Sequence, residues 1–257
     1  EFWIPGYPKL YGTTNQTDPG LTHSIPISDV NDLQDMQNDR SGNYYLTNNI
    51  DASGVEWIPI GTSSQRFTGT LDGCDYTISN LTISSKVSYA SLLGNVVGAT
   101  IANLTLSNVS IVGEYYHTGA IIGNVYLYEG YDFYMYNCHS SGNLYQAGDE
   151  NSLGRSGGLI GEIKRYSGET NCYAYIYDSS SSVNINHTEG NARGIYSGGF
   201  VGIAYRTTFQ NCSASGNIRN GISSGVYNGS WGGFVGRCEN CSFSYSYATG
   251  NVEGGGN

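Results

Sequence analysis

The residues best suited to acid–base chemistry are two aspartates three positions apart. Asp72 and Asp75 occur in the segment Leu71-Asp-Gly-Cys-Asp-Tyr76. Cleavage of a glycosidic bond needs two carboxyl groups that face the same bond, and this pair is the closest match to such a site. An Asp-Gly step is also common in turns. An elimination reaction would need a cluster of aspartates to hold a cation, together with a basic residue. Arg66 is near in the sequence, but no such cluster accompanies it. We therefore interpret both aspartates as turn residues and predict no catalytic residue.

The histidines give no indication of a metal site. His23, His117, His139 and His187 lie far apart in unrelated contexts. None of them has the spacing to another that metal ligands usually show. We predict no metal site and no cofactor.

Six cysteines, an even number, are typical of disulfides formed in an oxidising compartment. Cys238 and Cys241 have the Cys-x-x-Cys spacing of redox motifs and of half a zinc site. A redox motif would begin a helix and a zinc site would need two further ligands, and the sequence shows neither. We expect a loop disulfide there, or two separate bridges. Cys172 and Cys212 follow the same recurring motif at similar offsets. We predict that they pair, because strands about 4.8 Å apart bring Cα atoms within disulfide range.

Tyrosine is unusually abundant, with 23 residues. In the segment 172–177 every second residue is a tyrosine, and the alternation of a strand would place these tyrosines on one face. Two interpretations stay open: an aromatic surface for sugars or a neighbouring subunit, or strand-forming residues with a soluble end. The predicted interaction surface consists of Tyr173, Tyr175, Tyr177, Tyr134 and Tyr136.

Asn-x-Ser/Thr sequons indicate where glycans could be attached. Asn15, Asn186 and Asn228 lie in segments that we expect to be irregular, and they are the predicted glycosylation sites. Asn103 and Asn211, in contrast, belong to a recurring asparagine corner in which a glycan would find little room.

A recurring pentapeptide is the strongest pattern in the chain. Its copies span 119–123, 157–161, 198–202 and 232–236, and a shorter copy ends at Gly94. A second block at 137–144 recurs at 211–218 and 245–252, and a missing middle copy is expected near 178–185. We expect glycines at the closing turns to take positive φ and asparagines to form ladders at corners.

This alternation of strands and tight turns predicts an all-β fold, a parallel β-helix (β-solenoid). A β-propeller is the alternative, because repeats of this length also suit small blades. Gly accounts for 37 residues and the charged residues for only 12%, which excludes a helical bundle. A net charge of −10 argues against nucleic-acid binding, and no stretch approaches the ~18 apolar residues of a membrane span.

The pentapeptide followed by Asn-Cys-x-Ala-x-Gly-x-(apolar) resembles the GLUG motif of repetitive surface proteins. Earlier segments, such as Trp57-Ile-Pro-Ile-Gly61, are similar to the N-terminal coils common in such chains. The resemblance covers roughly residues 28 to 252. It implies a right-handed parallel β-helix on secreted or surface-anchored proteins, often adhesins or modules beside enzymes.

The first 38 residues differ from the repeats. Residues 1–27 hold four of the five prolines and are predicted to form an extended arm. A short capping helix is expected at about 28–38, with Ser28 as its cap and Val30, Leu33 and Met36 on one face. The solenoid domain would span 28–257, with repeats at about 43–252.

These features together predict an extracellular, non-catalytic protein with a structural or adhesive role at a cell surface. The expected partners are surface glycans or copies of the same chain, which would polymerise head-to-tail into a filament because no capping segment follows the last repeat. The alternative is a carbohydrate-binding or carbohydrate-active module of a secreted enzyme.

Overall fold

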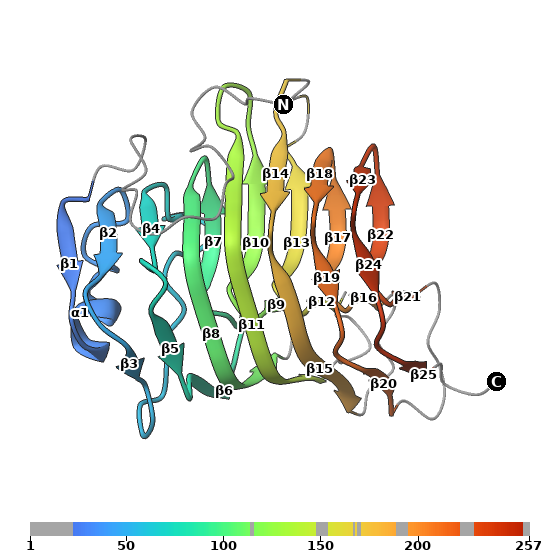
Figure 1. The fold of residues 1–257 in the computed structure, drawn as a ribbon, viewed down its shortest axis with the longest axis horizontal. Helices are drawn as coiled ribbons and strands as arrows, with labels where there is room; N and C mark the ends of the chain where they lie inside the picture. Colours follow the sequence, from blue (N-terminus) through green and yellow to red (C-terminus); the bar gives the residue numbers. More distant parts are fainter. Residues whose placement is uncertain are drawn as a thin grey trace.

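The fold is all-β and consists of parallel strands in three sheets (Figure 1). The computed structural model describes residues 23–113, 116–147, 154–166, 168, 171–188, 195–221 and 229–253. The sheets contain sixteen, five and four strands, and we call them A, B and C. One short helix, α1 (Val30–Asp35), lies beside the first strand at the N-terminal end of the stack (Figure 1).

Sheet A contains β1 (Ile25–Ile27), β2 (Asn43–Leu46), β3 (Ile50–Asp51), β4 (Thr70–Asp72), β5 (Thr77–Ser79), β6 (Thr82–Val87), β8 (Thr100–Gly113), β11 (Phe133–Ala147), β14 (Ala174–Tyr177), β15 (Ser180–Thr188), β18 (Thr207–Gln210), β19 (Ser213–Ala214), β20 (Ile218–Asn220), β23 (Ser242–Ser244), β24 (Tyr247–Ala248) and β25 (Val252–Glu253). Sheet B contains β7 (Leu93–Val97), β10 (Ile122–Leu127), β13 (Ile160–Arg165), β17 (Val201–Tyr205) and β22 (Val235–Glu239). Sheet C contains β9 (His117–Gly119), β12 (Arg155–Gly157), β16 (Tyr196–Gly198) and β21 (Ser230–Gly232).

The chain passes through sheets C, B and A in a constant order from β9 onward. We call each such passage a coil. Each pentapeptide forms the link from sheet C to sheet B: Gly119 ends β9 and Ile122 begins β10, and the other three copies repeat this arrangement. The apolar residues inside the motif, such as Leu159 and Phe200, are fully buried between the sheets. The repeat in the sequence therefore corresponds to a repeat of the same turn.

The pentapeptide glycines are required by the close approach of neighbouring coils. Gly123, Gly161 and Gly202 do not have positive φ, so the expectation of left-handed turns is wrong at these positions. A Cβ atom on Gly161 would lie 2.6 Å from the carbonyl oxygen of Gly123, and one on Gly202 would lie 2.5 Å from that of Gly161. Only glycine lets the backbones stack this closely.

The predicted asparagine corners are confirmed. Asn103, Asn137 and Asn211 have φ values of 48°, 50° and 54°, a region that asparagine tolerates better than most residues. Asn137 Nδ2 donates to Asn103 Oδ1 at 3.0 Å, and Asn211 Nδ2 donates to Asp178 Oδ1 at 2.6 Å. The missing middle copy is also found, because 180–185 pairs with 139–144 and Asp178 takes the place of the asparagine. The side chains thus form ladders from coil to coil.

The N-terminal elements differ in detail from the prediction. Asp29, not Ser28, caps α1, and its Oδ1 accepts the N–H groups of Asn31 and Asp32. Leu33 of the helix is fully buried in the core. Residues 1–22 of the predicted arm lie outside the described residues, but β1 within the arm already pairs with β2. The sheet therefore begins earlier than the predicted boundary at residue 27.

Candidate functional site

The predicted tyrosine surface lies on the outer side of β11 and β14 in sheet A. Along 172–177 the burial alternates as expected, with Cys172, Ala174 and Ile176 fully buried in the core. Tyr134 of β11 is paired in register with Tyr175 of β14. Together the five tyrosines form what we call the tyrosine patch: Tyr134, Tyr136, Tyr173, Tyr175 and Tyr177.

The rings of the tyrosine patch form a stacked array. The ring centroids of Tyr134 and Tyr175 are 5.3 Å apart with planes inclined by 12°. Tyr175 lies 6.4 Å from Tyr177 and 6.3 Å from Tyr173. Tyr173 is 40% exposed, whereas Tyr136 and Tyr177 are buried and form a small apolar cluster with Ala102. Three of the five predicted residues therefore offer accessible rings, and the other two support them.

The phenols of Tyr134, Tyr175 and Tyr177 remain protonated at neutral pH. Burial raises the pKa of Tyr177 to about 12. The pKa values of Tyr134 and Tyr175 are also raised, first by burial and then by the negative charge of Asp132. A neutral phenol can donate a hydrogen bond as well as accept one, so the patch combines flat apolar faces with polar tips.

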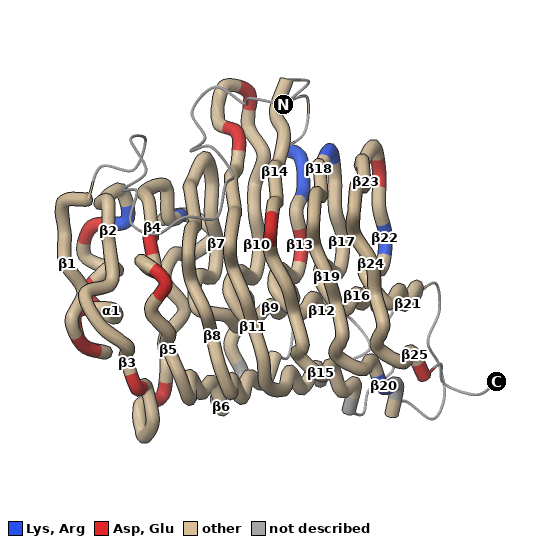
Figure 2. Tube along the Cα trace, in the orientation of Figure 1, with Lys and Arg blue, Asp and Glu red and all other residues tan. Residues whose placement is uncertain are grey.

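Cationic side chains extend the patch toward sheet B. The guanidinium group of Arg206 lies 5.6 Å from the ring of Tyr173 and 5.8 Å from that of Tyr205. Arg165 lies 4.9 Å from the ring of Tyr205. Figure 2 shows blue segments near β13, β18 and β22, although red segments lie near β13, β14 and β23 as well. Tyr173 therefore lies beside a cation in a region of mixed charge.

A polar groove lies on sheet A beyond the Asn137 corner of β11. Its volume is about 160 Å³. Asn184 Nδ2 donates to Asn143 Oδ1 at 3.5 Å, and the N–H of Asn217 donates to Asn184 Oδ1 at 3.1 Å. The groove is smaller than the roughly 300–1,000 Å³ of typical small-molecule pockets, so it suits contact with part of a longer ligand. Five side chains line it: Asn143, Asn184, Asn186, Asn217 and Arg219.

The groove and the tyrosine patch lie at the two ends of the same strand, β11. Figure 1 shows β11 as one long strand, with β14 beside one end and β15 beside the other. The tyrosine patch uses the β14 end and the asparagine groove uses the β15 end. An extended ligand could therefore contact both.

The two aspartates considered for catalysis support the corners of the fold. Asp72 is buried and its Oδ1 accepts hydrogen bonds from the N–H of Cys74 and from Asn103 Nδ2. Asp75 Oδ1 accepts a hydrogen bond from Asn137 Nδ2 at 3.0 Å. Both contacts favour the interpretation as turn residues.

Two groups of titratable side chains escaped the sequence analysis. His117, Arg155 and Lys164 surround the buried carboxylate of Glu162, with His117 Nε2 at 3.0 Å and Arg155 Nε at 3.2 Å from its oxygens. Burial holds the pKa of His117 well below its ordinary value, and the positive charges of Arg155 and Lys164 lower it further. The other group is His23, whose Nε2 lies 2.6 Å from Asp72 Oδ2. Residues of each group come from different coils, so spacing in the sequence could not reveal them.

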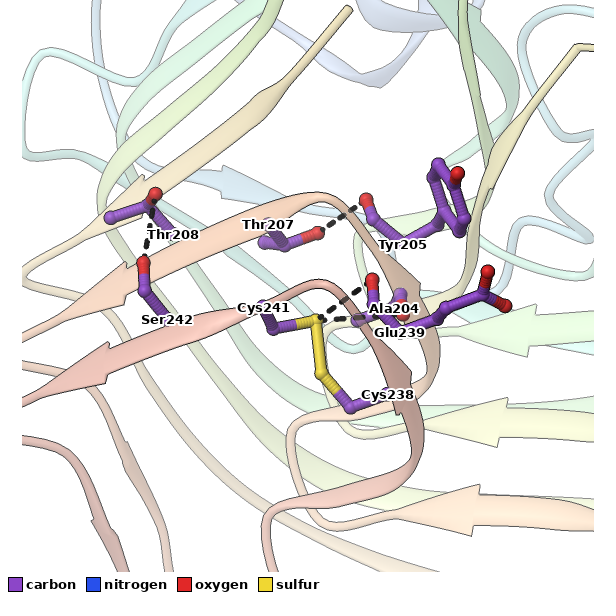
Figure 3. Close-up of a disulfide and its surroundings, with 8 residues drawn as sticks. All are labelled: Ala204, Tyr205, Thr207, Thr208, Cys238, Glu239, Cys241 and Ser242. Carbon is purple, nitrogen blue, oxygen red and sulfur yellow. Dashed lines mark hydrogen bonds between the residues drawn. A yellow bond between two sulfur atoms is a disulfide. The ribbon is translucent and has the colours of Figure 1, made fainter. Parts of the chain in front are cut away.

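Of the two alternatives for Cys238 and Cys241, the loop disulfide is confirmed, whereas the predicted pairing of Cys172 with Cys212 is wrong. Cys238 and Cys241 form a disulfide across the turn between β22 and β23 (Figure 3). Cys172 and Cys212 form no disulfide. The register explains the error: Ser180 pairs with Ser213, which places Cys212 beside Ser179, seven residues beyond Cys172. The two cysteines lie at similar offsets from their glycines but at different positions in the coil, because the connecting segments differ.

The predicted glycosylation sites are only partly described. Asn15 and Asn228 lie outside the described residues. Asn186 is not in an irregular segment, since it belongs to β15 and pairs with Tyr145 and Arg219 on the two sides. Its side chain is half-buried in the groove. Glycosylation of all three stays a prediction.

Comparison with known proteins agrees with the repeat. Residues 194–219 match the family model of the GLUG motif. This chain carries a GLUG motif. The resemblance predicted from the sequence is therefore confirmed. Residues 28–127, ahead of the GLUG segment, match the N-terminal region of the M26 IgA1-specific metallo-endopeptidases.

The similar curated protein is much longer than this chain, and the similar solved structures have low sequence identity to it. Over 152 residues, covering 53% of the GLUG-containing chain, the sequence is 31% identical to Halomucin of Haloquadratum walsbyi, and the match spans 2% of Halomucin. A crystal structure of a candidate immunoglobulin A1 protease from Bacteroides ovatus superposes with a TM-score of 0.56 and 19% identity, over 89% of this chain and 82% of that one. A structure named IgA1 Protease gives a TM-score of 0.47 and 16% identity, over 88% of this chain and 21% of that one. The Bacteroides structure shows the same fold. Among the described residues, no helix has the length and apolar character needed to cross a membrane.

Proposed function

We propose that this chain is a non-catalytic, adhesive module of an extracellular surface protein, and that it binds extended glycans along the outer side of sheet A. We further propose that its coils wind as a right-handed β-solenoid. The GLUG motif, the similarity to Halomucin and the Cys238–Cys241 disulfide support a location outside the cell.

One observation carries the proposal: β11 carries the tyrosine patch at the end paired with β14 and the asparagine groove at the end paired with β15. Sugar rings present apolar C–H faces and many hydroxyl groups. Tyr134 and Tyr175 offer flat faces for the former, and amides such as Asn184 offer donors and acceptors for the latter. The length of the combined surface favours a polysaccharide or a long glycan chain over a single sugar.

A glycan array followed by calorimetry tests the proposal. We expect binding of at least one oligosaccharide, weakened about 2- to 13-fold by Tyr175→Ala, since an aromatic contact contributes roughly 0.5–1.5 kcal/mol. Asn184→Ala should weaken the same ligand. Tyr247→Ala, which removes an exposed tyrosine of the last coil, is the matched control and should bind like the wild type. Binding that is absent from the array, or is unchanged in both patch variants, would refute the proposal.

A module of a secreted enzyme is the second candidate. The match of residues 28–127 to the N-terminal region of a peptidase family favours it. Release of new reducing ends from polysaccharides by the purified chain would support catalysis in this module itself. Among the described residues, the buried Glu162 beside His117 is the acid to change in that case. We expect no turnover in the wild type or in Glu162→Gln.

Head-to-tail association also remains a prediction. In the coil formed by β21–β25, Phe243 is 51% exposed, and Tyr245 and Tyr247 are exposed as well. Burial of these rings against another copy would stabilise a filament. Sedimentation velocity over a wide concentration range, with Phe243→Ser as the comparison, tests this: a concentration-independent monomer would contradict it.

A further inference from the structure

A histidine, a carboxylate and a thiol from two distant segments meet at the N-terminal end of sheet A. His23 precedes β1, Asp72 ends β4, and Cys74 follows in the corner turn. One nitrogen, oxygen or sulfur atom from each lies within 4.8 Å of the others. His23 and Asp72 are 49 residues apart in the sequence, which explains why the histidine spacings gave no sign of this cluster.

The contacts around the cluster hold its side chains in place. Asp72 is only 3% exposed, and its Oδ1 accepts hydrogen bonds from the N–H of Cys74 at 2.8 Å and from Asn103 Nδ2 at 3.0 Å. Its Oδ2 therefore remains directed at His23. The ring of His23 stacks on Tyr45 with centroids 4.9 Å apart. Outer contacts of this kind orient the ligands in metal sites.

Two carboxyl groups give the cluster a negative environment. Asp72 belongs to the cluster, and Asp75 follows Cys74 in the same turn. A divalent cation placed among these groups would offset that negative charge and stabilise the thiolate, whose proton would be released to the solvent.

We propose that His23, Asp72 and Cys74 form a binding site for Zn²⁺. Imidazole nitrogen, carboxylate oxygen and thiolate sulfur are the three ligand types that zinc uses in proteins, and a water molecule would complete a tetrahedral set. His23 Nε2 and Asp72 Oδ2, now 2.6 Å apart, would separate slightly to admit the ion. The His23 side chain is 28% exposed, so an ion could reach the site from solvent.

Zinc bound at this site would stabilise the N-terminal end of sheet A. The strand β1 pairs with β2, and β2 pairs with β4, so His23 and Asp72 belong to segments separated by one strand. An ion held between them would tie the segment before β1 directly to β4. Zinc should therefore raise the thermal stability of the protein in addition to binding it.

Titration of the metal-free protein with ZnCl₂ by calorimetry tests the site. We expect one ion per chain in the wild type, and affinity at least tenfold lower in His23→Gln and in Cys74→Ser. His187→Gln is the matched control, because His187 bonds Ser197 and makes no contact with the cluster. It should bind zinc like the wild type. Cobalt should give a thiolate-to-metal absorption band in the wild type that Cys74→Ser abolishes.

The absence of zinc binding to the wild type would overturn the proposal. A zinc affinity in both ligand variants equal to that of the wild type would overturn it as well. If either variant fails to fold, alkylation of the wild type decides instead. Zinc should then protect Cys74 from iodoacetamide in a peptide map, and modification at the same rate with and without zinc would also overturn the proposal.

Discussion

Replacement of Asn137 by alanine should reveal how much one corner residue contributes to stability. Its φ of 50° is unfavourable for alanine by roughly 1–2 kcal/mol. Its side chain also makes three hydrogen bonds: Nδ2 donates to Asn103 and Asp75, and Oδ1 accepts from His139 Nε2. At about 0.5–1 kcal/mol each in a half-buried position, these contribute about 2 kcal/mol. We therefore expect Asn137→Ala to lower the free energy of unfolding by about 3–4 kcal/mol.

The glycine variant separates the two contributions. Asn137→Gly loses the same hydrogen bonds but has no difficulty with positive φ, although its unfolded state gains roughly 0.5–1 kcal/mol of entropy. It should therefore be about 1 kcal/mol more stable than Asn137→Ala. Asn143→Ala is the control, because it removes an asparagine of β11 that is not at a corner. We expect it to cost less than 1 kcal/mol.

Equilibrium unfolding in guanidinium chloride measures these differences, provided that the slope m stays constant across the variants. The reasoning is refuted if the alanine variant is as stable as the glycine variant, because the left-handed backbone would then carry no cost. A loss below 0.5 kcal/mol in Asn137→Ala would also refute the ladder as a source of stability.

Three further changes test the core, the coil spacing and the buried histidine. Phe209→Ala, which removes a fully buried ring, should cost about 3–5 kcal/mol in chemical denaturation, and Phe243→Ala at the exposed end clearly less; equal losses would contradict the packing. Gly216→Ala would bring a Cβ within 1.8 Å of the Val183 carbonyl oxygen, so its melting temperature should fall well below that of Gly233→Ala, whose Cβ would meet only a side chain at 3.2 Å. Burial lowers the pKa of His187 from 6.5 to about 4, so the unfolded chain takes up a proton at a higher pH than the folded chain does. Stability should therefore fall by about 2 kcal/mol between pH 7 and pH 5 through this group. His187→Gln should be less sensitive to this change of pH in urea unfolding, and an unchanged pH dependence would argue against a buried neutral histidine.

The repeat was predictable because each coil uses the same local devices. The pentapeptides mark the links between sheets C and B, and the asparagines mark the corners of sheet A. Alternation in 172–177 correctly placed Cys172, Ala174 and Ile176 in the core, since a strand turns successive side chains to opposite faces. It did not show that Tyr177 on the other face is buried. The same local information could not distinguish a glycine needed for close packing from one needed for positive φ. Gly161 and Gly202 show the first case, which depends on the backbone of the neighbouring coil.

The sequence by itself thus determined the strands, the corners and the outward tyrosines, all of which depend on residues close together in the chain. For Cys238 and Cys241 it left a loop disulfide and two separate bridges open, and the structure decided for the loop disulfide. Only the tertiary structure decided which residues of different coils lie side by side. That register depends on the lengths of the connecting segments, so it separated Cys172 from Cys212 and brought His23 to Asp72. It also exposed only part of the tyrosine patch, because Tyr136 and Tyr177 are covered by their neighbours in adjacent coils.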